Sequence, residues 1–246
     1  MLTTDADCIV GPHWLPRNIA HLTEVDAVCG KVEPIVAEAD ILNGMNPQLA
    51  ALEGRYRTLV QNFYMRHAPR CADLAGTHGE AAGASLAFTK MAYLAVGGFV
   101  SARCGEDRQI VRMMRDRGCK VRHADDVTVQ ASCRLTGRAT GGMSDALKAR
   151  IGGADYLIDD CLPPADWLIR RAGSGTLGPW PAQVSGRLRF KVRDLPRHIE
   201  MLETCRNSGR AIPAPEAPAA TLSSSHLGTS MPSGGAITAS KPCAGN

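Results

Sequence analysis

The sequence predicts an α/β protein followed by a disordered tail, on the strength of two observations. Short β-prone segments alternate with helical segments over residues 1–206, which is typical of α/β domains. Residues 211–246 consist mainly of Ala, Ser, Pro, Gly and Thr, with Glu216 and Lys241 as their only Asp, Glu, Lys or Arg residues. Because such a segment cannot bury enough apolar surface to offset the entropy lost on ordering, we expect it to be disordered.

The clearest single element is a helix over residues 47–66, which carries an apolar stripe at helical spacing. Asn46 can cap this helix, and Pro47 suits its first turn because proline lacks the N–H that would be unpaired there. Before it we expect a β-prone segment within 1–10 that runs into an acidic turn, a short helix at 12–22 and a strand at 27–36.

Two further helices have recognisable ends. Thr89 can cap a helix that Gly97 and Gly98 terminate, and Gly118 can terminate another from the position after its last residue. We expect strands at 84–88, 120–123 and 127–131, and helices at 108–117, 143–151 and 190–206. Pro196 must start or interrupt the last of these helices. We expect a loop at 68–83 and less regular chain at 152–190.

The composition is that of a folded protein with an aliphatic core. Of 246 residues, 44% are hydrophobic but only 4% are aromatic. The net charge of +4 comes without a dense Lys/Arg run, so we predict an ordinary solvated surface and no nucleic-acid partner. No apolar run approaches the roughly 18 residues that span a bilayer, so we predict no transmembrane segment.

Nine cysteines are scattered along the chain, and no two of them have C-x-x-C spacing. An odd number of cysteines without a secretory signal argues against a disulfide framework. We therefore expect mostly buried, reduced thiols in a cytoplasmic protein.

Two acidic pairs are the candidates for chemistry. Asp5 and Asp7 follow a β-prone segment at i and i+2, where two carboxylates can meet one hard divalent cation. The alternative is a solvated acidic turn. Glu106 and Asp107 precede a helix, where Asp107 can act as a general base. The alternative is that both acids simply stabilise the helix N-terminus. Gly98 ends a helix, or allows close approach of the backbone to an acceptor.

The order of these pieces along the chain is more specific than any one of them. Thr4-Asp5-Ala6-Asp7 is followed by Gly83-Ala84-Ser85-Leu86-Ala87-Phe88, then by Gly97-Gly98-Phe99 and by Gly105-Glu106-Asp107. This order resembles the second half of the inverting family 2 glycosyltransferases, which have the GT-A type fold. The resemblance covers residues 1–150.

The resemblance implies a partial GT-A (nucleotide-diphospho-sugar transferase) fold, with a mixed sheet flanked by helices. Residues 1–150 would form part of the catalytic domain, 151–210 a helical extension and 211–246 a disordered tail. The implied reaction moves a sugar from a nucleotide-diphospho-sugar to an acceptor hydroxyl with inversion. The acceptor would be a saccharide, a lipid or a small metabolite.

The same resemblance implies roles for individual residues. Asp5 and Asp7 would hold Mn or Mg and the donor diphosphate, and Asp107 would be the catalytic base with Glu106 beside it. Contacts to the donor or acceptor would come from Gly83, Ala84, Ser85 and Gly98, and Arg138, with Arg134, would bind phosphate. Where many relatives carry a further His ligand, residues 127–132 have none, and His123 is more readily explained as a surface or a structural histidine.

One departure concerns the N-terminal part of the family's domain, which binds the nucleotide through βαβ units. Here the D-x-D element falls within the first residues of the sequence. We expect that another chain supplies an upstream half, or that the chain is inactive as a fragment. We also expect an exposed sheet edge where the missing strands would pair. The alternative function is a non-catalytic remnant or binding module that keeps part of the fold.

Overall fold

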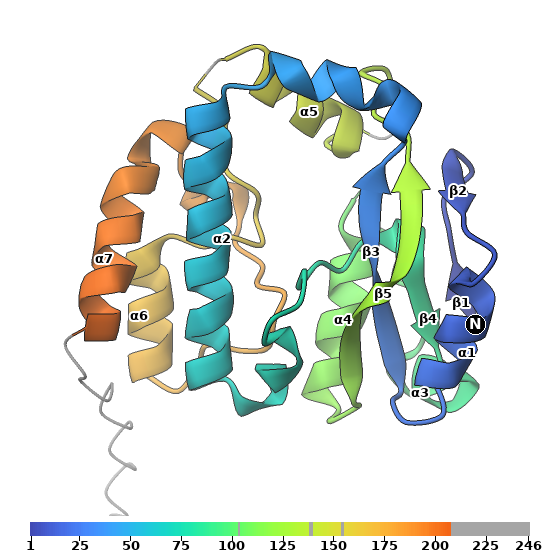
Figure 1. Ribbon diagram of the computed structural model, residues 1–246. Helices are drawn as coiled ribbons and strands as arrows, with labels where there is room; N and C mark the ends of the chain where they lie inside the picture. The colour runs from blue at the N-terminus through green and yellow to red at the C-terminus, as the bar shows by residue number, and fades with distance from the viewer. Residues whose placement is uncertain (103, 138–139, 154, 208–246) are drawn as a thin grey trace, which may run out of the picture. The chain divides into compact units, whose positions relative to one another are not determined.

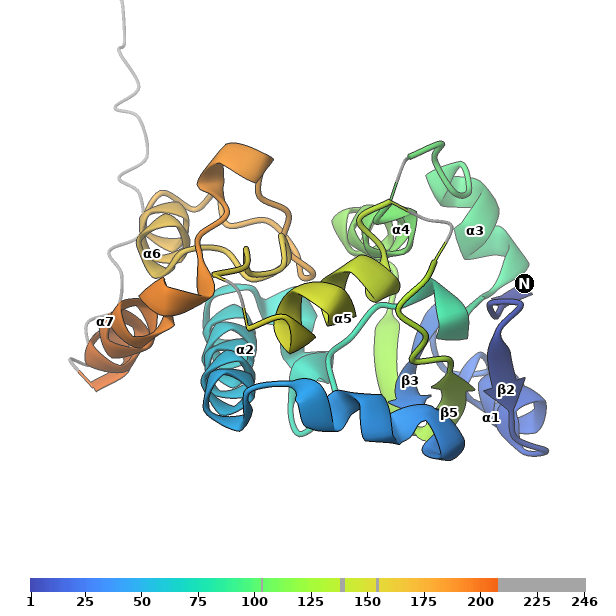
Figure 2. The ribbon, with the colours of Figure 1, turned by 90° about the horizontal axis from the view of Figure 1, so that it is seen from above.

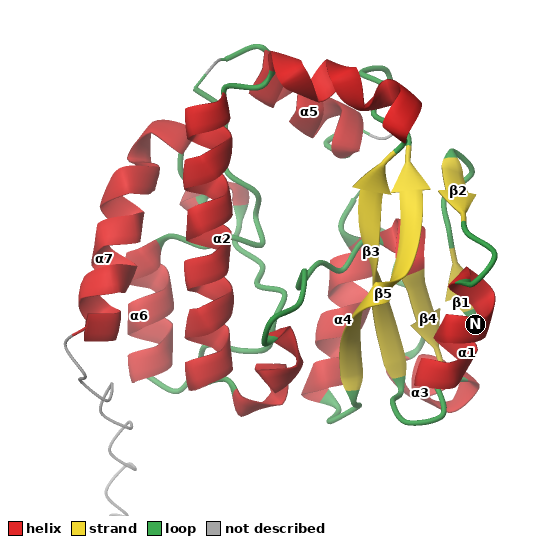
Figure 3. Ribbon diagram, in the orientation of Figure 1, coloured by secondary structure: helices red, strands yellow, loops and turns green. Residues whose placement is uncertain are grey.

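A five-stranded mixed sheet organises the first half of the chain, as Figure 3 shows. The computed structural model describes residues 1–102, 104–137, 140–153 and 155–207. The strand order is β1-β4-β3-β5-β2, and only the β3–β5 pair is parallel. The α/β prediction is therefore confirmed, and the predicted tail at 211–246 lies outside the described residues. The strands are β1 (Leu2–Thr3), β2 (Cys8–Val10), β3 (Ala27–Pro34), β4 (Leu86–Phe88) and β5 (Val121–Ala131).

The sheet bends where β5 carries three more residues than β3. Gly30 pairs with Ala124 but Lys31 pairs with Thr128, so residues 125–127 have no counterpart on β3. Such bulges bend a strand and increase its local twist. The sequence predicted two separate strands at 120–123 and 127–131, and this was wrong because β5 runs through the bulge as one strand.

The bend divides the sheet into two halves with different neighbours. The first residues of β3, Ala27–Cys29, pair with β4, whereas the last residues of β5, 129–131, pair with β2. The strands β1 and β2 therefore lie at opposite ends of the strand order although only residues 4–7 separate them in the chain. Those four residues include the Asp5-Ala6-Asp7 turn.

Gly30 is required at the bend for steric reasons. A Cβ atom at this position would lie 2.2 Å from the Ser85 Oγ atom and 2.6 Å from the carbonyl oxygen of Val127. These distances are far shorter than real Cβ contacts, and one of the atoms belongs to the backbone of the bulge itself. A side chain at position 30 would push β3 away from the bulge and from the segment around Ser85.

Helices cover both faces of the sheet, because successive residues of β3 point to opposite sides. Ala27 and Cys29 pack against residues of α3 (Lys90–Val96) and α4 (Glu106–Asp116). Val28 belongs to a separate cluster that packs against Trp14 of α1 (Trp14–His21). Figure 2 shows α3 and α4 on one side of the sheet and α1 on the other.

A second core lies among α2 (Pro47–His67), α6 (Ala165–Gly173) and α7 (Leu195–Asn207), which stand side by side in Figure 1. Asn46 caps α2 as predicted, since its side chain accepts from the N–H groups of Gln48 and Leu49 at 3.0 and 3.1 Å. The helix α6 was not predicted, because 152–190 has no long apolar period. The remaining elements are α5 (Met143–Ile151) and the short helices η1 (Val36–Gly44), η2 (Pro69–Leu74), η3 (Gly83–Ser85), η4 (Gly186–Leu188) and η5 (Val192–Asp194).

None of the helices in the described ranges has the length and apolar character needed to cross a membrane. Seven cysteines within these ranges are free thiols, and four of them are buried; the seven are Cys8, Cys29, Cys71, Cys104, Cys119, Cys133 and Cys161. The expectation of reduced thiols is met for those seven.

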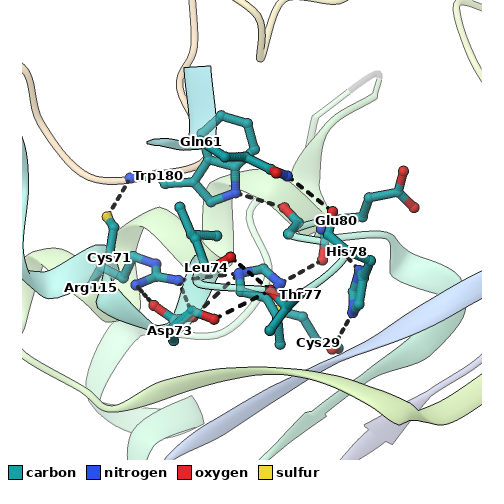
Figure 4. Close-up of polar contacts among 12 residues, drawn as sticks. Cys29, Gln61, Cys71, Asp73, Leu74, Thr77, His78, Glu80, Arg115 and Trp180 are labelled. Atoms are coloured by element: carbon teal, nitrogen blue, oxygen red, sulfur yellow. Dashed lines mark hydrogen bonds and ion pairs between the residues drawn. The ribbon is translucent and has the colours of Figure 1, made fainter. Parts of the chain in front are cut away.

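A buried polar network joins η2 to α4 and β5 (Figure 4). The Arg115 guanidinium donates to both carboxylate oxygens of Asp73, at 2.7 and 2.6 Å. It also lies 3.2 Å from His123 Nε2, while His123 Nδ1 lies 3.0 Å from the carbonyl oxygen of Glu80. The guanidinium can only donate, so His123 accepts at Nε2 and donates from Nδ1. This neutral, structural histidine agrees with the sequence interpretation.

We predict that Gly30→Ala destabilises the fold by about 1–3 kcal/mol, the usual cost of overpacking a filled site. Chemical denaturation of the purified chain measures this effect. Gly11→Ala is the matched control, because a Cβ at Gly11 meets no atom within 4 Å. Equal stability of the two variants would contradict the steric role of Gly30.

We predict that His123 makes the fold sensitive to acid. Burial, and then the charge of Arg115, lower the pKa of His123 from 6.5 to about 3. The unfolded chain therefore binds the proton more readily, and stability falls as the pH drops from about 6.5 towards 3, by at most about 1.4 kcal/mol per pH unit. His123→Gln keeps one donor and one acceptor but does not titrate, so its stability should depend less steeply on pH between 6.5 and 4. An unchanged slope would contradict the assignment.

Candidate active site

The Asp5-Ala6-Asp7 turn leads from β1 into β2 and holds two carboxylates close together. The backbone N–H of Cys8 closes the turn by donating to the carbonyl oxygen of Asp5 at 3.1 Å. The N–H of Ser132 donates to the carbonyl oxygen of Asp7 at 3.3 Å, which ties the turn to the end of β5. One ligand atom each from Asp5, Asp7 and Cys8 lies within 4.8 Å of the others.

The chemistry of these donors fits a hard divalent cation. Carboxylate oxygens are the ligands that Mg²⁺ and Mn²⁺ prefer, and Mg²⁺ sites commonly use one or two carboxylates together with phosphates and water. Burial raises the pKa of the Cys8 thiol above its usual value. Since thiolate is the form of cysteine that binds metals, Asp5 and Asp7 are the ligands that this turn offers.

The second acidic pair lies at the N-terminal end of α4. Glu106 and Asp107 are the first two residues of this helix, which starts two residues earlier than the sequence predicted. One Asp107 carboxylate oxygen accepts from the backbone N–H of Gly83 at 2.9 Å. The other accepts from the N–H of Arg108 at 2.6 Å. These bonds fix the orientation of the carboxylate, and the helix N-terminus favours its negative charge.

The pairing of β1 with β4 brings the turn close to this helix end, because Gly83, shortly before β4, binds Asp107. Partial burial raises the pKa of Asp5, and the charges of Asp7, Asp107 and Glu106 raise it further, in that order. Like charges disfavour ionisation of a carboxyl group. Hydrogen bonds show the same proximity, because Gly83 accepts from the hydroxyl of Thr3, just before the turn, and donates to Asp107. The four acidic residues that the sequence singled out therefore lie close together, and we call them the acidic cluster.

Two arginines flank the cluster. Arg134 pairs with Asp7 at 2.6 Å, and both side chains remain partly exposed. Arg108, next to Asp107, pairs with Asp160 at 2.9 Å. Arg138, the other predicted phosphate contact, lies outside the described residues.

The predicted Gly83-Ala84-Ser85 segment is only partly directed at the cluster. Gly83 contacts Asp107, and its carbonyl oxygen accepts from the Thr3 hydroxyl at 2.8 Å. Ala84 and Ser85 are buried, and the Ser85 hydroxyl accepts from the Trp14 indole N–H at 3.1 Å. Contact of Ala84 and Ser85 with a donor sugar stays a prediction, and their observed role is to pack η3 against the sheet.

Gly98 is explained by the end of α3. Gly97 is the left-handed C-cap with φ of 84°, and Gly98 follows with φ of 75°. The positive φ of Gly98 favours glycine, and a Cβ there would lie 2.9 Å from the Tyr93 ring, which would have to shift. The acceptor contact predicted for Gly98 is not tested by this geometry.

Searches against protein-family models, curated proteins and solved structures find no match.

Sequence reasoning missed the Arg108–Asp160 pair. The sequence offered a reason to single out Arg108, since it directly follows Asp107. It offered no reason to single out Asp160, which lies in a loop without periodicity and pairs with α4 only in the folded chain. His123 is absent from the group of possible metal ligands found among the described residues.

Proposed function

We propose that the chain transfers a sugar from a nucleotide-diphospho-sugar to an acceptor hydroxyl with inversion, on a partial GT-A fold. The observation that carries the proposal is that Gly83 contacts both sides of the cluster. Its carbonyl oxygen accepts from the hydroxyl of Thr3, two residues before Asp5, and its N–H donates to Asp107. A donor site and a base must lie next to each other for such a transfer, and these are the two acidic pairs that the resemblance assigns to those roles.

In this proposal Asp5 and Asp7 hold Mn²⁺ or Mg²⁺, and the remaining coordination positions are left for the diphosphate and water. When bound, the cation neutralises the diphosphate and so makes it a better leaving group. Arg134 lies at the same carboxylate, 2.6 Å from Asp7. If Asp7 binds the cation instead of Arg134, the Arg134 guanidinium is placed to pair with a phosphate oxygen.

Asp107 is the proposed general base. The acceptor oxygen forms a bond to the anomeric carbon while the bond from that carbon to the diphosphate oxygen breaks, and the acceptor proton passes to Asp107. The N–H groups of Gly83 and Arg108 hold the carboxylate in a fixed orientation. Glu106, beside it, is proposed to orient the acceptor.

One observation favours the alternative of a binding module without catalysis. The Arg134 guanidinium already compensates the Asp7 carboxylate, so the fold meets part of the charge requirement of the cluster without a cation. This alternative predicts binding of anions that does not depend on a metal.

We predict that nucleoside diphosphates bind only in the presence of Mn²⁺, as measured by calorimetry on the full chain with UDP, GDP, ADP and CDP. Asp5→Ala/Asp7→Ala should weaken this binding at least tenfold, because it removes both metal ligands. Asp107→Asn should leave it unchanged but abolish sugar transfer, because the amide cannot take the proton. Asp116→Ala, at an exposed residue at the far end of α4, is the control for loss of an acid.

Binding that is equal with and without Mn²⁺ would support the binding module instead. Transfer retained by Asp107→Asn would exclude Asp107 as the base. Absence of binding to all four nucleotides would contradict the proposed donor site.

A further inference from the structure

A cavity of about 230 Å³ lies between α2, α5 and the segment around Tyr156, apart from the acidic cluster. Its lining combines an apolar wall, which includes Leu49, with four charged side chains. The cavity is smaller than the roughly 300–1,000 Å³ of pockets for drug-sized ligands, so it suits a ligand of about one ring.

Gly54 belongs to the lining of the cavity and is exposed. It lies inside α2, where glycine destabilises a helix relative to alanine. Its φ is not in the left-handed region, and a Cβ there would meet no atom within 4 Å. A larger side chain can therefore be placed at this point of the lining without a clash.

The first pair of charged side chains is closed off by protein contacts. Arg150 donates to both carboxylate oxygens of Glu53, and the Tyr156 hydroxyl donates to the same carboxylate at 3.1 Å. The third Arg150 nitrogen, Nη1, donates to the carbonyl oxygen of Ala146 at 3.0 Å. This pair forms a rigid polar wall.

The second pair is open to a ligand. Arg57 donates from Nη1 to Glu80 Oε1 at 3.0 Å, and the two side chains are 28% and 38% exposed. Within the described part of the chain, Nε and Nη2 of Arg57 and Oε2 of Glu80 have no protein partner. The four side chains sum to zero charge. The cavity thus offers donors and an acceptor side by side without favouring a charged ligand.

Neighbouring hydroxyls match this arrangement, because each hydroxyl both donates and accepts. One hydroxyl can accept from Arg57 while the next donates to Glu80. The C–H face of a sugar ring can pack on the apolar wall at Leu49.

The cavity is connected to the proposed base through a short stretch of chain. Glu80 precedes Gly83, whose N–H binds Asp107, by three residues, so their Cα atoms lie within about 11 Å of each other. Two adjacent aspartates provide a second link, since Asp159 contacts Arg150 of the cavity at 3.6 Å and Asp160 pairs with Arg108.

We propose that this cavity binds one ring of a neutral saccharide, and that this saccharide is the acceptor. The acceptor role rests on the proposed function. The binding itself depends only on the open Arg57–Glu80 pair, the apolar wall and the space at Gly54.

The test is an NMR titration of the full chain with the methyl glycosides of glucose, galactose and mannose, and with methyl glucuronide as a charged counterpart. At least one neutral glycoside should bind, more tightly than the glucuronide. Gly54→Leu should weaken this binding at least tenfold by filling the cavity, without disturbing the helix. Ala51→Leu adds a leucine to an exposed position of α2 that does not line the cavity, and should change the affinity less than twofold.

The proposal is overturned if no neutral glycoside binds, if the glucuronide binds more tightly, or if Gly54→Leu binds as the wild type does. Calorimetry with nucleoside diphosphate and Mn²⁺ on Gly54→Leu distinguishes a failure of the saccharide site from a failure of the proposed function. Nucleotide binding should be unchanged in this variant. Glycoside binding by a chain that binds no nucleotide would support the saccharide site and overturn its role as an acceptor site.

Discussion

The contact between Gly30 and the bulge of β5 is the constraint on which the rest of the sheet depends. Only a residue without a side chain leaves room for the carbonyl oxygen of Val127 and the hydroxyl of Ser85. The three-residue insertion bends the sheet there, so that β4 and β1 extend one half and β2 extends the other. The Asp5-Ala6-Asp7 turn joins β1 to β2 and so connects the two ends of the strand order.

The acidic cluster brings like charges together, and this disfavours ionisation of its carboxyl groups. Partial burial raises the pKa of Asp5, and the neighbouring carboxylates of Asp7, Asp107 and Glu106 raise it further. The N-terminal end of α4 and the two flanking arginines compensate part of this charge, although exposed ion pairs contribute little to stability. Perturbed carboxyl groups of this kind are more frequent at functional sites than elsewhere on a protein.

Local chemistry in the sequence predicted the ends of the helices well. Asn46 with Pro47, Thr89 and Gly97 each carry their signal within a few residues, and the structure places each of them at the cap or first turn that was expected. The β5 strand was divided in error because Asp125 and Asp126 have the composition of a turn, whereas the continuous strand depends on its pairing with β3. Short α6 was missed for a related reason, since its stability comes from packing against the core around α2.

In the candidate site, too, local features were predicted from the sequence and long-range contacts were not. Spacing located both acidic pairs, but their proximity depends on the pairing of β1 with β4 and on the contact of Gly83 with Asp107, which no local pattern predicts. Asp160 and the Arg57–Glu80 pair were missed because they act through long-range contacts.

The most direct test of the cluster is paramagnetic relaxation by Mn²⁺, observed in the amide NMR spectrum of the full chain. The effect of a bound paramagnetic ion falls steeply with distance. An ion held by Asp5 and Asp7 should broaden the signals of Cys8, Gly83 and Glu106 at concentrations that leave those of α7 sharp. Equal broadening at exposed acids of α6 and α7, such as Asp166 and Glu200, would show that Mn²⁺ has no preferred site and would contradict the account.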